Sequence, residues 1–597
     1  MSPFATAAPE LDWVTIQQRI DTEHLDRDAA WLALVHDRSR WFGSWKSQAD
    51  RASFFLSPQG NGDPRAELLA TARALLVDAD APAGRCRFPA RDRWLRARLG
   101  LPPSDALQAC AALREWYQPL AAKEISIEFA SAYLESPLSM FGHTFLRFHV
   151  PDLPPLLQPT VNYAADSSKR TGALAFIVQG LFGGFPGVAD QLPYFRRVRI
   201  YSDNEGRDLW DYPLHLDAEQ IELLLLHLWE IKDGTFDYYF LDENCSYRTL
   251  DLITATRPEL HLMDSLHGDV APIETLKLMR DHGLLGAPTY WPSAVKTLEW
   301  HTRDFSRDEL RLTWEVATGV RTLDQLESLD AQQRAEILRA AAEYQSILVA
   351  RDQIPVDDRD RLVPALIRER LKSTQPLNRD APPTPPRPDV AHSGHTLSAA
   401  WIDHAGDNGV DVGYAGFQHT LTDPFAGYTA GTAVTILGGH IRFMPGGSHR
   451  LQNFDVLRVT SETPSTALLD RATWSLYLGA QRKWVDEDQP LVGSVAFAAG
   501  RGISIAGNTA ALTLGGSLDA GRTFAHDVAF EGEARASVTR QMQGWSYQAF
   551  ASFGKYLLAD HDNSYDYGVQ IGVPLPGTSV QLAARRREVA IELRKYF

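Results

Sequence analysis

Residues 395–597 carry few helix signals and consist largely of extended runs separated by Gly, Asp, Asn and Pro. Several runs are about ten residues long and alternate apolar or small side chains with polar ones, the period of a strand with two unlike faces. In one run the two sets of positions hold Val528, Phe530 and Val538, and Glu531, Glu533 and Arg535. This pattern predicts an antiparallel β-barrel.

The barrel could span a membrane or be soluble. A membrane barrel turns its apolar face outward, whereas a soluble barrel or β-sandwich turns it inward. The chain ends in an alternating strand that finishes at Phe597, and this resembles the closing strand of bacterial outer-membrane barrels. We favour the membrane barrel, although the frequent Gly and Ala on the supposed lipid face keep the soluble alternative open.

A membrane barrel fixes where side chains point. Its last strand should pair with a first strand that begins near Thr396, because no sheet edge can face hydrocarbon. The outward set should be Val528, Phe530, Val538, Ile591 and Leu593, and the inward set Glu531, Glu533, Arg535, Glu592 and Arg594. Aromatic residues expected near the two rims are Trp474, Tyr477, Trp545, Tyr547 and Tyr596.

The rest of the chain divides by composition. Residues 1–120 show helical spacing and predict a helical N-terminal domain, followed by a catalytic domain over residues 121–265. Residues 266–372 predict a helical region with solvated charged faces, and the proline-rich residues 373–394 predict a stiff extended linker. The expected fold class is therefore α+β multidomain, with a C-terminal β-barrel over residues 395–597.

The chain has three cysteines, which point to different roles. Cys86 and Cys110 lie close together in the helical region and, in an exported chain, are expected to form a disulfide. Cys245 is then the unpaired thiol, at a turn leading into a predicted helix whose N-terminal N–H groups would lower its pKa and receive an oxyanion. The alternative is a buried structural cysteine.

A thiol nucleophile needs a base, and His143 is the best candidate. It follows Gly142 at the start of a predicted strand, with Phe145 and Arg147 on its own face and other apolar residues on the opposite face. A neutral imidazole can take the thiol proton. His149, at the far end of the same strand, is the second candidate.

A third group should orient the imidazole. The next extended segment offers Asn162 near its start and Asp166 at its end, and either side chain could accept the second ring N–H. The alternative for each is an ordinary turn-capping role.

Four stretches carry a resemblance to a known family. They are Ser136–Phe148, Asn162–Asp166, the Gly/Phe-rich Gly180–Gly187 with Pro193–Phe195, and Arg207–Tyr212 leading to Asn244–Tyr247. Over about residues 120–260 the chain resembles the N-terminal periplasmic domain of Lnb-type lipoprotein acyltransferases, within the circularly permuted papain-like superfamily that includes lecithin:retinol acyltransferase. The resemblance implies transfer of an acyl chain through an acyl-cysteine, with Cys245 and His143 in the family's Cys and His positions. After residue 260 the chain departs from the multi-pass membrane plan of the well-understood members.

Residues flanking these positions are candidates for substrate contact. Asn244 and Tyr247 surround the cysteine, while Phe182, Phe185 and Tyr194 could form an apolar lip for a lipid tail. The alternative is ordinary packing of aromatic residues.

The net charge and the motifs limit which ligands and partners are expected. A net charge of −16 with no sustained basic run argues against nucleic acid. The eighteen histidines show no metal-ligand spacing and no phosphate-binding loop is present, so we expect neither metal nor cofactor. Met1–Pro9 does not look like a signal peptide. Either the chain is cytosolic or its signal peptide has been removed, and the cysteine pattern and the barrel favour the second reading.

The sequence therefore predicts a bacterial cell-envelope protein, with a barrel in the outer membrane and a periplasmic catalytic domain. The leading function is a cysteine acyltransferase or acyl-ester hydrolase acting on a lipid or lipoprotein through an acyl-cysteine. One alternative is a cysteine peptidase or amidase acting on cell-wall peptides. Another is a non-catalytic outer-membrane scaffold.

Overall fold

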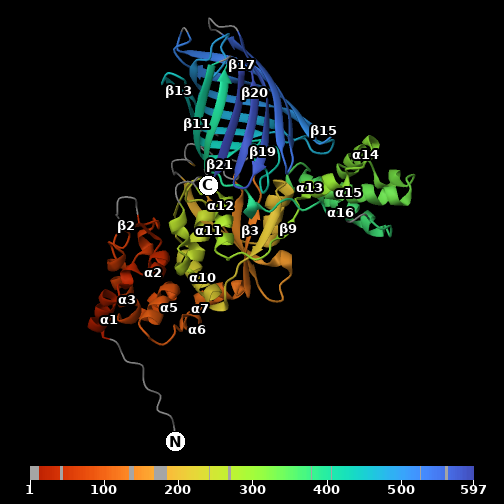
Figure 1. Ribbon diagram of the computed structural model, residues 1–597. Helices are drawn as coiled ribbons and strands as arrows, with labels where there is room; N and C mark the ends of the chain where they lie inside the picture. The colour runs from red at the N-terminus through yellow and green to blue at the C-terminus, as the bar shows by residue number, and fades with distance from the viewer. Residues whose placement is uncertain are drawn as a thin grey trace. The chain divides into compact units, whose positions relative to one another are not determined.

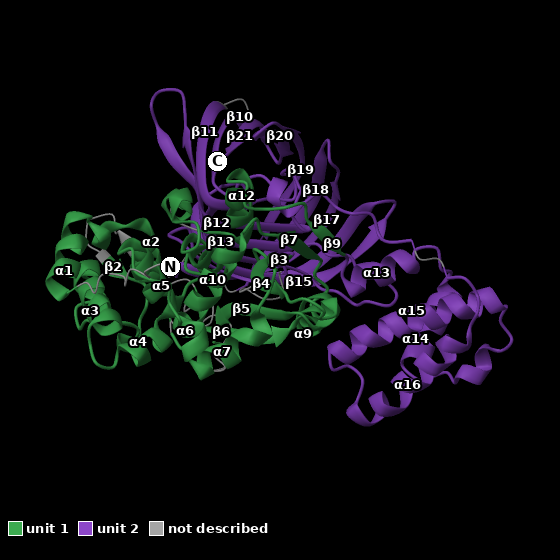
Figure 2. Cartoon of the chain, turned by 90° about the horizontal axis from the view of Figure 1, so that it is seen from below, with its two compact units in different colours: residues 1–130, 136–291 green, residues 131–135, 292–597 purple. Residues whose placement is uncertain are grey.

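A computed structural model of the chain describes residues 12–39, 45–133, 140–166, 180, 185–234, 236–240, 242–266, 270–377, 380–404, 407–524, 526–557 and 563–597. The chain forms two compact units, one of residues 1–130 and 136–291 and the other of residues 131–135 and 292–597 (Figure 2). Among the described residues, no helix combines the length and apolar character needed to cross a membrane.

The first unit begins with a helical layer, drawn in red and orange in Figure 1. Buried side chains such as Trp31, Leu68 and Leu95 form its core. Its elements are α1 (Trp13–Thr22), α2 (Ala29–Leu34), β1 (Asp37–Ser39), β2 (Trp45–Ser47), α3 (Pro64–Leu76), α4 (Ala81–Arg87), α5 (Pro89–Arg98), α6 (Ala106–Ala109) and α7 (Ala111–Tyr117).

The expected disulfide is present in this layer. Cys86 in α4 is bonded to Cys110, which lies between α6 and α7, with their Cα atoms 5.5 Å apart. Cys245 is free and buried. The prediction of one bonded pair and one unpaired thiol is confirmed.

A seven-stranded antiparallel sheet follows, in the order β8-β6-β5-β4-β3-β7-β9. The helices α10, α11 and α12 contribute to one core with it, and α9 and the π-helix η6 lie between β6 and β7 in the chain. The elements are β3 (Glu124–Ala130), β4 (His143–His149), β5 (Pro159–Ala165), β6 (Phe185–Pro193), α9 (Tyr194–Val198), η6 (Arg199–Asn204), β7 (Leu209–Pro213), α10 (Ala218–Ile231), β8 (Phe236–Tyr238), α11 (Cys245–Thr254), α12 (Pro272–Asp281) and β9 (Thr289–Trp291).

The alternation of β4 divides its side chains between two environments. Leu146 and Phe148 belong to the main core with Leu250 of α11. Phe145, on the other face, packs with Tyr194 and Tyr201. His143 shares the Phe145 face at the start of the strand, as the sequence predicted, and its ring centroid lies 6.5 Å from that of Phe145.

The second unit begins with four helices around Leu338, Tyr344 and Ile347. They are α13 (Ala294–His301), α14 (Arg307–Ala317), α15 (Ala331–Ala350) and α16 (Val356–Lys372). In the same core lie Leu468 and Leu469, from the connection between barrel strands β13 and β14. These contacts attach the helices to the barrel.

Residues 396–596 form a closed antiparallel barrel of twelve strands (Figure 1). The last strand pairs with the first, with Thr396 opposite Tyr596, as predicted. The strands are β10 (Thr396–His404), β11 (Asp407–His419), β12 (Thr432–Phe443), β13 (His449–Ser461), β14 (Thr473–Arg482), β15 (Leu491–Ile505), β16 (Asn508–Ala520), β17 (Val528–Gln541), β18 (Ser546–Leu557), β19 (Asn563–Leu575), β20 (Thr578–Arg585) and β21 (Glu588–Tyr596).

The barrel has an apolar outside and a polar inside. All five residues expected outward are exposed, for example Phe530 and Leu593, and the five expected inward are buried or half-buried. Inside, Lys483 pairs with Asp519 at 2.9 Å and also with Glu531. A soluble barrel would show the opposite arrangement, so this is a barrel of the outer-membrane type.

Two of the aromatic residues expected at the rims point inward instead. Tyr477 is buried beneath the Arg458 guanidinium, whose carbon lies 4.3 Å from the ring centroid. Tyr596 is buried and donates a hydrogen bond to Asp423 at 2.6 Å. Both side chains lie in the polar interior of the barrel, so the expectation that Tyr477 and Tyr596 face the water–lipid boundary was wrong.

Candidate active site

Cys245 is the first residue of helix α11, and the sequence around it explains why the helix begins there. The Asn244 side chain caps the helix, its Oδ1 accepting from the backbone N–H groups of Ser246 (3.1 Å) and Tyr247 (3.2 Å). The Asn244 Nδ2 donates to the carbonyl of Val270 at 2.5 Å. This buried cap holds the thiol at the positive end of the helix dipole.

The thiol lies against two strands. Burial raises the pKa of Cys245, and hydrogen bonding from the backbone of Thr144 and the side chain of Tyr238, together with the positive charge of Arg207, opposes that rise. Thr144 belongs to β4 and directly follows His143, whereas Tyr238 ends β8. The cysteine thus rests as a buried neutral thiol among groups that favour its ionised form.

His143 is held by Asn162, across the pair of neighbouring strands β4 and β5. Its Nε2 lies 2.5 Å from the Asn162 Oδ1, and both side chains are buried. An amide oxygen only accepts hydrogen bonds, so Nε2 carries the proton and Nδ1 keeps its lone pair. The imidazole is therefore oriented with Nδ1 as its basic atom.

The charge state of His143 follows from its surroundings. Burial lowers the pKa of His143 to about 3, with a further lowering by the charges of Arg207 and Arg197 and an opposing effect of the Asn162 hydrogen bond. The ring is neutral near pH 7, the form required of a proton acceptor. Its centroid lies 5.5 Å from that of Tyr201.

Arg207 is the positive group common to both side chains. It is buried, and its Nη2 donates to the carbonyl of Ala130 at 2.8 Å. Ala130 is the residue of β3 paired with His143 in the sheet. This attachment places a fixed cation beside the start of β4.

The other residues predicted for the site make contacts in different parts of the domain. The backbone N–H of Asp166 donates to Pro186, and Tyr247 is buried with its hydroxyl 3.1 Å from Gln48 of the helical layer. Phe185 stacks on Phe240, and Tyr194 packs against the guanidinium of Arg147. Phe182 lies outside the described residues.

His149, the second candidate for the base, lies at the other end of β4. Its Nε2 is 2.6 Å from the hydroxyl of Ser126. In the structure, therefore, His143 and not His149 contacts one of the residues expected to orient the imidazole, Asn162.

Three residues of the site, Thr144, Tyr238 and Arg207, were given no role in the sequence analysis. Tyr238, seven residues before the cysteine, is buried and faces the thiol. Arg207 lies within a stretch that carried the family resemblance but was given no role. Tyr238 opens a Tyr-Tyr-Phe run just before the cysteine, and this was the available signal.

The arrangement combines the parts that acyl transfer through sulfur needs. They are a thiol at a helix N-terminus, a neutral oriented imidazole from the neighbouring strand, and hydrogen-bond donors facing the thiol. A thiolate formed here would be nucleophilic, and the helix N-terminus would favour an oxyanion.

Comparisons with known families match three parts of the chain. Residues 112–282 match the Lnb N-terminal periplasmic domain, which confirms the resemblance found in the sequence. Residues 385–588 and 23–98 match two domains of unknown function, DUF7840 and DUF7843. No curated protein sequence matches the chain.

Two solved structures are similar to part of the chain. LpxR from Salmonella typhimurium is 11% identical, over 34% of this chain and 100% of its own, with a TM-score of 0.21. The COG4313 outer membrane channel from Pseudomonas putida F1 is 12% identical, over 38% of this chain and 100% of its own, with a TM-score of 0.22.

Proposed function

We propose that this chain, which carries an Lnb N-terminal periplasmic domain over residues 112–282, is a cell-envelope cysteine acyltransferase or acyl-ester hydrolase. Its substrate is a lipid or lipoprotein and its intermediate an acyl-cysteine on Cys245. The main support for the proposal is the hydrogen bond by which Asn162 orients the buried His143 ring. His143 lies on β4 directly before Thr144, which faces the Cys245 thiol.

In the first half-reaction the Cys245 proton passes to Nδ1 of His143 as the sulfur attacks the acyl carbonyl carbon. A C–S bond forms, and the carbonyl oxygen becomes an oxyanion. The N-terminus of α11 and the Tyr238 hydroxyl are the donors placed to stabilise it. The C–O bond to the leaving alcohol then breaks, and the alcohol oxygen takes the proton from His143.

In the second half-reaction an acceptor attacks the thioester. The acceptor is water for hydrolysis, or an amine or alcohol for transfer, and it gives its proton to His143. The C–S bond breaks, and the sulfur recovers the proton as the Cys245 thiol. Asn162 keeps the ring in one orientation throughout both steps.

The surroundings of the thiol favour an apolar acyl group. Phe185, Tyr238 and Phe240 form a small buried cluster with Tyr163 packed against it. Tyr238 faces the cysteine, so the aromatic cluster begins beside the Cys245 thiol. A hydrocarbon chain is the substrate portion such aromatic surfaces accept. We assign a permuted papain-like fold to this domain because His143 lies on one strand, Asn162 on the next strand, and Cys245 at the start of a later helix.

The barrel supplies the anchor. Its outer surface carries many exposed large apolar side chains, such as Leu512, Leu514 and Phe553, while the charges of Lys483 and Asp519 are paired inside. We propose insertion in the outer membrane, with the catalytic domain in the periplasm, where a disulfide such as Cys86–Cys110 persists.

The test is product analysis with two substrate classes. Purified full-length protein in phospholipid vesicles would be incubated with a diacylated lipopeptide or with muropeptides, and the products identified by mass spectrometry. Release or transfer of a fatty acyl group, absent in Cys245→Ala, supports the proposal. Cleavage of the muropeptide amide alone would make the protein a cell-wall amidase. No Cys245-dependent product with either substrate would favour the scaffold.

A further inference from the structure

Three residues with no metal-ligand spacing in the sequence meet at one end of the barrel. His392 precedes β10, His419 ends β11, and Asp423 lies in the following connection. Each offers one ligand atom, and these atoms all lie within 4.8 Å of one another. His419 and Asp423 are buried, and His392 is half-buried.

The tautomer of His392 makes Nε2 its acceptor nitrogen. Its Nδ1 lies 2.7 Å from the carbonyl oxygen of Ser393, which only accepts, so Nδ1 carries the proton. Nε2 of His392 therefore accepts a hydrogen bond from Nδ1–H of His419, 3.0 Å away. A hydrogen bond from one imidazole nitrogen to a carbonyl is the usual orienting contact of a metal-binding histidine.

The distance between the two nitrogens suits a shared ion. Two nitrogens each about 2.0–2.1 Å from a tetrahedral zinc ion are separated by roughly 3.3 Å. The Nδ1–H of His419 donates to His392, and the Nε2 of His419 has no hydrogen-bond partner among the described residues. A cation bound between the two facing nitrogens would take the place of this hydrogen bond, with the His419 proton moving to Nε2.

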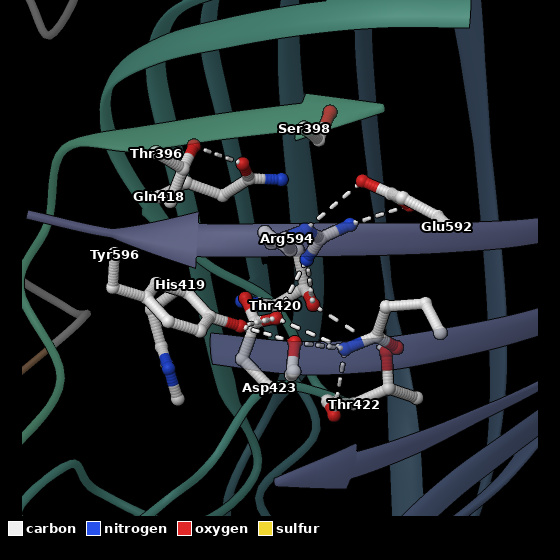
Figure 3. A network of polar contacts seen from close by, with 12 residues as sticks. Thr396, Ser398, Gln418, His419, Thr420, Thr422, Asp423, Glu592, Arg594 and Tyr596 are labelled. Carbon is white, nitrogen blue, oxygen red and sulfur yellow. Dashed lines mark hydrogen bonds and ion pairs between the residues drawn. The ribbon is translucent and has the colours of Figure 1, made fainter. Parts of the chain in front are cut away.

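Asp423 supplies the charge, held in place by its neighbours (Figure 3). Its Oδ1 accepts from Arg594 and from Tyr596, both at 2.6 Å, whereas Oδ2 accepts from the backbone N–H of Thr420. Oδ2 therefore keeps a lone pair. The Arg594 charge is offset by Glu592 as well as by Asp423, so the carboxylates exceed the cation by one.

We propose that His392, His419 and Asp423 bind one divalent first-row transition metal ion, with Zn²⁺ as the best fit. Two imidazoles and a carboxylate form a common three-residue zinc set that leaves a fourth position for water or a ligand. The ion joins the segment entering the barrel to the β11–β12 connection, beside the closing pair Thr396 and Tyr596. This proposal is independent of the Cys245 chemistry.

The experiment is a zinc titration of full-length protein in detergent micelles after removal of metals with a chelator. We expect one zinc ion per chain by calorimetry, and at least about a 10-fold loss of affinity in His392→Ala and His419→Ala. The control is His449→Ala, an exposed histidine of the same barrel that should bind as the wild type does. Equal binding by wild type and the His392→Ala/His419→Ala double variant would overturn the proposal.

A second measurement on the wild type avoids dependence on variant folding. X-ray absorption of the zinc-loaded protein should show only nitrogen and oxygen ligands, with the multiple-scattering signature of two imidazoles. A sulfur ligand would place the ion at Cys245 and overturn the proposal. Absence of imidazole scattering would overturn it as well.

Discussion

The Nε2 atom of His143 lies 2.5 Å from the Oδ1 atom of Asn162, and both side chains are buried between neighbouring strands. This contact fixes which ring nitrogen is basic. In Asn162→Ala we expect kcat to fall by roughly 10-fold to 100-fold, less than the ~10²–10⁴ typical of losing the base itself. The change in kcat is measured from initial rates at saturating substrate.

The matched comparison uses Asn162→Asp and His149→Ala. The carboxylate introduced by Asn162→Asp would keep an acceptor for the Nε2 proton, so most of the activity should remain. His149 contacts Ser126, and its loss should be mild. Full activity in Asn162→Ala, or a large loss in His149→Ala, would mean that the base has been misassigned.

Removal of Arg207 should change the pH profile. Burial and the Arg207 charge lower the pKa of His143, so protonation of the wild-type ring removes activity only well below its ordinary pKa. In Arg207→Gln the imidazolium loses a repelling neighbour, its pKa rises, and the acidic limb of kcat/KM moves to higher pH.

Arg197 provides the control for this shift. It also lowers the pKa of His143, but its contribution is the smallest of the four. Arg197→Gln should therefore move the acidic limb in the same direction by less. A limb that moves to lower pH in Arg207→Gln would show that the arginine does not act through the charge of His143.

The disulfide prediction concerns stability and thiol count. The Cys86–Cys110 bond closes a loop with a sequence separation of 24 and should stabilise the helical layer by about 2–4 kcal/mol. Denaturant unfolding with and without reductant measures this. Under denaturing, non-reducing conditions one thiol per chain should react, and none in Cys245→Ala. Three reactive thiols in the wild type would refute the bond.

The orientation of the barrel predicts a lipid-dependent penalty. The Leu514 side chain is 65% exposed on the outer surface of β16. In vesicles, Leu514→Arg should lower the free energy of unfolding by up to about 2–4 kcal/mol, depending on its depth in the bilayer. The control is Leu514→Ala, which should cost much less. Equal stability of the arginine variant in lipid would contradict insertion.

Local patterns were enough to predict several parts of this molecule. The alternation around Val528 and Phe530 encodes the outward face because a strand has a period of two, whichever strands flank it. Cys245 was predictable as a helix start because Asn244 is a favoured capping residue. The position of His143 after Gly142, at the start of a strand, was equally local.

Other features depend on contacts between distant segments. The choice of Asn162 over Asp166 required the register of β4 and β5, which short-range patterns do not give. Tyr477 and Tyr596 resemble rim aromatics in sequence, but both side chains are buried inside the barrel, where Arg458 covers the Tyr477 ring and Tyr596 donates to Asp423. His392, His419 and Asp423 come together only when the barrel closes.

We propose above that Cys245 carries an acyl group during turnover. The most direct measurement is the mass of the protein after rapid acid quenching of a reaction with an activated fatty-acyl ester, followed by peptide mapping. We predict one acyl group per chain, on Cys245, removed by hydroxylamine, formed much more slowly in His143→Ala and absent in Cys245→Ala. An acyl group on another residue, or product formation by Cys245→Ala at the wild-type rate, would contradict an acyl-cysteine intermediate on Cys245.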